Sequence, residues 1–151
     1  MQPSVSESAG GNRVLFVLTA ILSLAGMSIS AVSLQRHYAK SSSDFCDLSQ
    51  AFNCDVVNRS EYSELAGIPV AGIGIAGYAA LFLLSTFWRS RPETPARLLA
   101  AATAGLVFAL CLTYVEARVL KTWCILCIGS QALILLITVL SAILKLRAPR
   151  T

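Results

Sequence analysis

The cysteines are the residues of this sequence best suited to chemistry. There are five of them in 151 residues: Cys46, Cys54, Cys111, Cys124 and Cys127. Four form two pairs, one with seven intervening residues and one in a C-x-x-C motif. Residues three apart lie on one face of a helix, so the sulfurs of Cys124 and Cys127 can meet at a helix start. The helix dipole there favours a thiolate at Cys124, and nearby Lys121 can add to this effect.

Three interpretations of the paired cysteines stay open. A four-cysteine zinc centre would need closer spacing than the seven-residue gap of the first pair. Two static disulfides would stabilise a loop, but they give no reason for a C-x-x-C motif at the start of a hydrophobic span. A redox relay between the two pairs explains both, and we favour it, without a metal. We expect Cys111 to be a small apolar packing residue and His37 to be an interfacial polar residue.

Four nearly uncharged hydrophobic stretches must position these cysteines. The chain is 56% hydrophobic and 13% charged, against about 45–50% and about 25% in an average soluble domain. Each stretch approaches the roughly 20 residues that a helix needs to cross a bilayer. A soluble enzyme, a nucleic-acid-binding module and a disordered chain are therefore poor interpretations. The sequence predicts an all-α membrane protein, a four-transmembrane-helix bundle with spans Val14–Leu34, Ile68–Trp88, Leu98–Val115 and Trp123–Leu144.

The distribution of basic residues predicts the orientation of these spans. The segments expected inside (1–13, 89–97 and 145–151) hold seven Lys and Arg residues, and those expected outside (35–67 and 116–122) hold five. This bias favours cytoplasmic termini at both ends of the chain. Both cysteine pairs then face the periplasm or exterior, an oxidising compartment where paired cysteines are expected to bond or to cycle. We interpret the basic residues as topology signals, with no role in binding nucleic acid.

The long outer loop between the first two spans is too long to be a simple connector. We expect it to fold back over the bundle through four apolar side chains: Phe45, Phe52, Tyr62 and Leu65. Within it, residues Ser60–Leu65 are predicted to form a short surface helix capped by Ser60. The redox domain is expected over residues 13–146, after a disordered tail over 1–12 and before a basic tail over 147–151.

The second span is rich in small residues, and the spans lack other catalytic patterns. Ala71, Gly72, Gly74 and Gly77 allow close helix packing, or they leave room for a flat ligand. No Ser-His-Asp arrangement, phosphate-binding loop or carboxylate pair occupies the spans. Hydrolysis, phosphoryl transfer and proton-coupled transport therefore lack their usual residues.

The combination of these motifs resembles bacterial homologues of vitamin K epoxide reductase over residues 13–146. The resemblance rests on the two cysteine pairs, the four spans and three short strings: Cys54-Asp-Val-Val-Asn-Arg-Ser60, Gly67-Ile68-Pro69 and Gly74-Ile75-Ala76-Gly77-Tyr78. It implies a four-helix bundle that holds a quinone, ubiquinone or menaquinone, near the C-x-x-C motif. It also implies that the loop pair brings electrons from a thioredoxin-like protein.

The resemblance assigns a role to each paired cysteine. Cys46 resembles the sulfur met by the partner protein, and Cys54 the shuttle that exchanges with Cys124. Cys127 corresponds to the sulfur that faces the quinone. Ser60 matches a serine that the family keeps after the second loop cysteine.

The resemblance also places Val70 and Gln131 where the vertebrate enzymes have an Asn and a Tyr that touch the quinone oxygens. This difference favours a quinone held by other polar contacts over epoxide reduction.

We therefore expect a membrane thiol–quinone oxidoreductase in a bacterial inner membrane that reoxidises a periplasmic thioredoxin-fold thiol oxidase. The oxidase is expected to be a separate protein, because the sequence ends at Thr151. Two alternatives remain. One is a quinone or vitamin K epoxide reductase that supplies reduced quinone. The other is a non-enzymatic membrane subunit with static disulfides.

Overall fold

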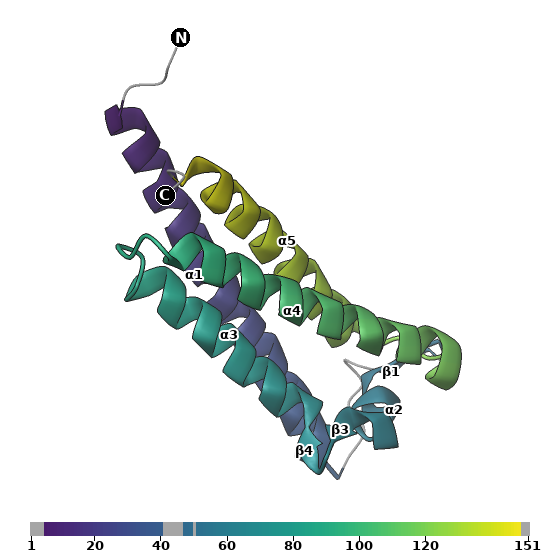
Figure 1. Ribbon diagram of the computed structural model, residues 1–151. Helices are drawn as coiled ribbons and strands as arrows, with labels where there is room; N and C mark the ends of the chain where they lie inside the picture. The colour runs from purple at the N-terminus through teal and green to yellow at the C-terminus, as the bar shows by residue number, and fades with distance from the viewer. Residues whose placement is uncertain (1–4, 41–46, 50, 149–151) are drawn as a thin grey trace.

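The computed structural model describes residues 5–40, 47–49 and 51–148 of the chain. Most of this part is helical, and four long helices lie alongside one another (Figure 1). They are α1 (Val5–Tyr38), α3 (Val70–Thr86), α4 (Thr94–Val115) and α5 (Ile125–Arg147). Helix α1 packs against α3 and α5, and α4 packs against α5. The start of α1 and the end of α5 lie at one end of the bundle, and the short elements of the loop gather at the other.

Among the described residues, three helical segments are long and apolar enough to cross a membrane: Gly10–Tyr38, Thr94–Leu120 and Ile125–Arg147. Helix α3 is also apolar but has 17 residues, which at 1.5 Å per residue span roughly 26 Å. It is shorter than the stretch Ile68–Trp88 because Ile68 and Pro69 pair in a strand. That the chain crosses the membrane four times stays a prediction.

The helix ends differ from the expected spans at several points. Helix α1 already begins at Val5, whereas the sequence predicted a disordered tail over 1–12. No proline lies between Val5 and Tyr38, and a glycine inside a helix costs only about 1 kcal/mol, so the helix continues through Gly10 and Gly11. Helix α4 begins at Thr94 and not at Leu98, with proline in its first turn, where no backbone hydrogen bond is lost. Residues 149–151 of the expected basic tail lie outside the described part.

The loop between α1 and α3 contains two small hairpins. In the first, β1 (Asp47–Ser49) pairs with β2 (Phe52–Asn53) and leads into the five-residue helix α2 (Cys54–Asn58). In the second, β3 (Glu64–Leu65) pairs with β4 (Ile68–Pro69), with Leu65 opposite Ile68. The tight turn between β3 and β4 has positive φ angles at Ala66 (53°) and Gly67 (80°).

The predicted surface helix over Ser60–Leu65 is wrong. A single 3-10 turn, η1 (Glu61–Ser63), forms there, because the residues that follow are held in the second hairpin. The Ser60 hydroxyl donates to the carbonyl of Val57 (2.8 Å) and caps no helix.

Two buried clusters hold the fold together. The larger lies between the long helices and centres on Leu98, Ala102, Ile137 and Leu144. In it, the Tyr78 hydroxyl donates to the carbonyl of Ser130 (2.8 Å), which ties α3 to α5. The smaller cluster lies at the loop end of the bundle and consists of Cys54, Val57 and Cys124. The loop thus folds back over the bundle as expected, but through Cys54 and Val57, since Phe52, Tyr62 and Leu65 are exposed. Phe45 lies outside the described residues.

Candidate active site

Backbone pairing between the loop and the start of α5 brings Cys54 beside Cys124. Phe52 forms an isolated parallel bridge with Trp123. The amide of Trp123 donates to the carbonyl of Ala51 (2.9 Å), and the amide of Asn53 donates to the carbonyl of Trp123 (3.1 Å). The two cysteines directly follow these paired residues. Cys54 is 1% exposed and Cys124 is 0% exposed. The expectation that the loop lies on the start of the last helix is confirmed.

Each cysteine of this group occupies a helix start. Cys54 opens α2, where the Asn53 carboxamide oxygen accepts from the amide of Val56 (3.1 Å) and caps the helix. Cys124 is the residue before the first turn of α5, and Cys127 follows within that turn. The side chains of Cys54 and Cys127 both hydrogen-bond to Cys124, and Cys124 and Cys127 are free thiols. The sulfurs therefore form a continuous series from the loop into the bundle.

The Cys124 thiol is acidified by its surroundings. Its pKa is lowered from an ordinary 9.0 to about 7, chiefly because the Cys127 thiol hydrogen-bonds to the Cys124 sulfur. Burial and the negative charge of Glu116 act in the opposite direction. A thiolate at Cys124 agrees with expectation, but the nearby charge is a carboxylate and not Lys121. Lys121 is exposed on a left-handed turn (φ 51°) that carries its side chain into solvent.

Glu116 is a residue of this candidate site that sequence reasoning missed. It begins the five-residue π-helical turn η2 (Glu116–Leu120) at the end of α4 and is 3% exposed. Its Oε2 accepts from the amide of Cys124 (3.1 Å), and its carboxylate also hydrogen-bonds to the Cys127 thiol. The sequence placed Glu116 in an aqueous connection. One signal in the sequence could have pointed to it: Glu116 is the single acidic residue after Glu93.

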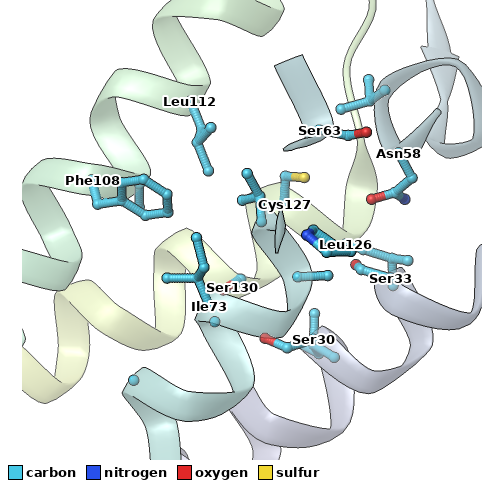
Figure 2. A pocket seen from close by; sticks show the side chains of 18 of the residues that line it. Ser30, Ser33, Asn58, Ser63, Ile73, Phe108, Leu112, Leu126, Cys127 and Ser130 are labelled. Atoms are coloured by element: carbon cyan, nitrogen blue, oxygen red, sulfur yellow. The ribbon is translucent and has the colours of Figure 1, made fainter. Parts of the chain in front are cut away.

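A cavity of about 400 Å³ opens beside Cys127, between the long helices. This volume falls within the range typical of small-molecule sites. Most of its wall is apolar, and Figure 2 shows Phe108, Leu112 and Ile73 on one side of Cys127. Gly74 and Gly77 of α3 also line it. A Cβ added at Gly77 would meet no atom within 4 Å, so this position leaves room for a ligand. A Cβ added at Gly74 would lie 2.8 Å from the Ser30 hydroxyl oxygen, so Gly74 serves the close packing of α3 on α1.

Polar groups gather at the end of the cavity near the loop. Asn58 and Ser63 lie across from the hydrophobic side in Figure 2. The Asn58 side-chain nitrogen is buried without a hydrogen-bond partner in the described part of the chain. His37 Nδ1 contacts the carbonyl of Asn58 (2.6 Å), and His37 Nε2 contacts the Glu64 carboxylate (3.1 Å). His37, expected only as an interfacial residue, thus belongs to the cavity wall.

The remaining predicted site residues are placed as follows. Ser60 and Val70 line the cavity. Gln131 is not among the lining residues in the described part, and its side-chain oxygen accepts a hydrogen bond from Thr113, which does line the cavity. Cys46 lies outside the described residues. Cys111 is exposed on α4, so its prediction as a packing residue is wrong: this face of α4 turns away from the neighbouring helices.

Among the described residues, no three His, Cys, Asp or Glu side chains are grouped so that they could hold a metal ion. Glu116, Cys124 and Cys127 are joined by hydrogen bonds within the protein. The arrangement is suited to thiol–disulfide exchange at one end and to an apolar reactant at the other.

The sequence model described as the vitamin K epoxide reductase family matches residues 17–142. The matched range contains both cysteine pairs, Glu116 and every residue that lines the cavity. A search of curated proteins finds no match to the chain.

Proposed function

The chain belongs to the vitamin K epoxide reductase family, and from this premise we propose that it passes electrons from a protein dithiol to a quinone. Members of the family are membrane-bound oxidoreductases that act on quinone-type substrates. To this general activity the proposal adds the direction of electron flow and the identity of the electron donor. The donor is a thioredoxin-fold thiol oxidase outside the membrane, and the chain reoxidises it through its two cysteine pairs.

One observation carries this proposal: three sulfurs lie in series and the last one reaches the cavity. Cys54 contacts Cys124, Cys124 contacts Cys127, and Cys127 lines the apolar cavity. In exchange, a Cys54 thiolate attacks Cys124 in the Cys124–Cys127 disulfide, and the loop pair then closes its own disulfide. Cys124 is a good leaving group in this second step because its pKa is about 7. The electron pair then leaves through Cys127 to the quinone.

The cavity has the chemistry that a quinone ring needs. Its apolar walls suit the flat ring and its hydrocarbon tail, whereas a few donors suit the two ring oxygens. The side-chain nitrogen of Asn58, which has no hydrogen-bond partner among the described residues, is such a donor, and the hydroxyls of Ser60 and Ser63 lie at the same end. Val70 adds an apolar contact at the start of α3, and Gln131 would act on the ligand only through Thr113.

Quinone reduction by the purified protein tests this function. With a reduced dithiol protein as donor and a short-tailed quinone as acceptor, loss of quinone absorbance should match the dithiol consumed. Cys124→Ala and Cys127→Ala should each abolish turnover, whereas the control Cys111→Ala should keep the full rate because Cys111 is exposed on α4. Full turnover by Cys127→Ala would contradict the proposal.

Reduction of a quinone epoxide is the second candidate, favoured by membership of the family itself. Offering the epoxide in place of the quinone to the same preparation separates the two activities. We expect quinone to be the faster substrate, because Val70 offers no polar group to the ring. A non-enzymatic subunit with static disulfides would consume neither substrate.

A further inference from the structure

Glu116 is a buried carboxylate without a cation. It is 3% exposed, and no ion pair joins it to a Lys, Arg or His among the described residues. Its two hydrogen-bonding neighbours are the amide of Cys124 (3.1 Å) and the thiol of Cys127. Burying an unpaired carboxylate costs several kcal/mol. A glutamine would accept from the same amide at lower cost, so the backbone contact alone does not explain an acid here.

The position of the Cys127 proton supplies the explanation. The Cys127 thiol is in hydrogen-bonding reach of both the Cys124 sulfur and the Glu116 carboxylate. Glu116 and Cys127 also line the same cavity. The other ionisable groups in that wall are His37, Tyr62 and Tyr78. His37 is engaged by Asn58 and Glu64, and Tyr78 by Ser130.

We infer that Glu116 is a catalytic residue that takes the proton of Cys127 when the thiol is oxidised and returns it when the disulfide is reduced. The inference rests on the proposed function and adds a group to it. Arg118 and Lys121, the basic residues nearest in sequence, are exposed and form no ion pair with Glu116 in the part of the chain that the structure describes.

The oxidising half of the cycle balances as follows. Cys127 gives its proton to the Glu116 carboxylate and its electron pair to the quinone, and the Cys124 thiolate attacks the Cys127 sulfur to close the disulfide. The quinone gains two electrons from the dithiol and two protons from water, and it leaves as the quinol. Glu116 is now a neutral carboxylic acid, the form that burial favours.

The reducing half returns the proton. A Cys54 thiolate attacks the Cys124 sulfur, the bond between Cys124 and Cys127 breaks, and the Cys127 thiolate takes the proton from the Glu116 carboxyl. The second loop thiolate then attacks Cys54 and frees Cys124 as a thiolate. The two electrons come from the donor dithiol, whose two protons are released to water.

Glu116→Gln separates proton transfer from structure, because glutamine keeps the acceptor for the Cys124 amide. General acid–base groups contribute typically 10²–10⁴-fold, so we expect turnover with quinone to fall by about 10²-fold. The residual rate should rise with pH, as hydroxide replaces the missing base, whereas the wild-type rate should be much less steep. Glu116→Asp keeps a carboxylate and should recover a large part of the rate.

The controls distinguish failure of the proton-transfer role of Glu116 from failure of the proposed quinone reduction. If the wild-type protein reduces no quinone, the proposed function fails. If the wild type is active and Glu116→Gln matches it in rate and pH profile, the proton role alone is overturned. A Glu116→Asp rate as low as that of Glu116→Gln would also overturn it. Continued protection of Cys54 and Cys124 from a bulky maleimide shows that each variant keeps the native packing.

Discussion

At the scale of single residues, Cys124 is tuned by two neighbours that act against each other. The hydrogen bond from Cys127 lowers its pKa, and the charge of Glu116 raises it, with a net value of about 7. The Cys124 thiol is therefore expected to ionise closer to neutral pH than an ordinary cysteine. A sulfur with this pKa is both a usable nucleophile and a good leaving group at neutral pH.

Alkylation of reduced protein should report this pKa directly. Iodoacetamide is small enough to reach Cys124 during brief openings of the loop. Because only the thiolate reacts, the modification rate should rise through a midpoint near pH 7, below the ordinary 9.0. Cys127→Ala removes the largest cause of the lowering, so the midpoint should move up. Mass spectrometry of the Cys124 peptide measures each profile, with Cys111→Ala as the unshifted control. A midpoint that stays or falls in Cys127→Ala would contradict this account.

Asn58 should matter for quinone affinity and little for folding. Its buried side-chain nitrogen lacks a partner in the described part of the chain, and a net hydrogen bond is worth about 1 kcal/mol. Asn58→Leu should therefore raise the KM for quinone by about 5-fold or more without lowering the thermal midpoint of the free protein. The control is Ser85→Ala, since Ser85 is buried outside the cavity. An unchanged KM in Asn58→Leu would rule out this contact.

At the scale of elements, one stretch of backbone pairing connects the loop to α5. The bridge between Phe52 and Trp123 joins segments about 70 residues apart in sequence, and the cysteines follow it directly. The loop therefore has a defined resting position on the bundle. Its exchange with Cys124 needs only a small adjustment of α2.

Removing one main-chain donor should loosen this position. In a Cys46→Ala, Cys111→Ala, Cys127→Ala background, Cys54 and Cys124 should form a disulfide that joins the halves of a chain cut between α3 and α4. Asn53→Pro deletes the amide that donates to the carbonyl of Trp123 and should slow this bond about 10-fold. Asn53→Ser keeps both the amide and a capping side chain, so it should leave the rate of disulfide formation unchanged. Equal rates on a non-reducing gel would show that the pairing does not position Cys54.

Sequence patterning predicted the elements better than their contacts. Long apolar stretches are local signals, so the helices lie close to their expected positions, and the C-x-x-C motif marked the start of α5. The hairpin that replaced the expected Ser60–Leu65 helix depends on pairing with Ile68 and Pro69, which no local propensity reveals. Glu116 was missed for a related reason. Its burial arises from the π-helical turn that folds α4 back toward Cys124.

At the scale of the whole molecule, the candidate active site lies at one end of the helix bundle. The start of α1 and the end of α5 lie at one end of the bundle, and α2, which begins at Cys54, lies at the other (Figure 1). The turn between α3 and α4 contains Arg91 and leads into α4, and Lys121 precedes the start of α5. If the chain crosses the membrane as predicted, these two exposed positions lie on opposite sides of it.

Single cysteines at these positions test the orientation better than the native ones, because Cys54 and Cys124 are buried. In a variant whose five cysteines are replaced by alanine, Lys121→Cys should react with an impermeant maleimide on intact cells. Arg91→Cys should react only after permeabilisation. The reverse pattern would place the sulfur series in the cytoplasm and remove the oxidising compartment from the proposed function.

The near-complete burial of Cys54 and Cys124 has a consequence for side reactions. A sulfur without exposed surface is attacked by a dissolved thiol, or by peroxide, only during brief openings of the loop. Small reductants such as glutathione therefore compete poorly with a protein whose surface engages the loop. The rate of futile reduction, in which cellular thiols consume quinone without making a useful disulfide, is then set by how often the loop lifts and not by how much thiol surrounds it.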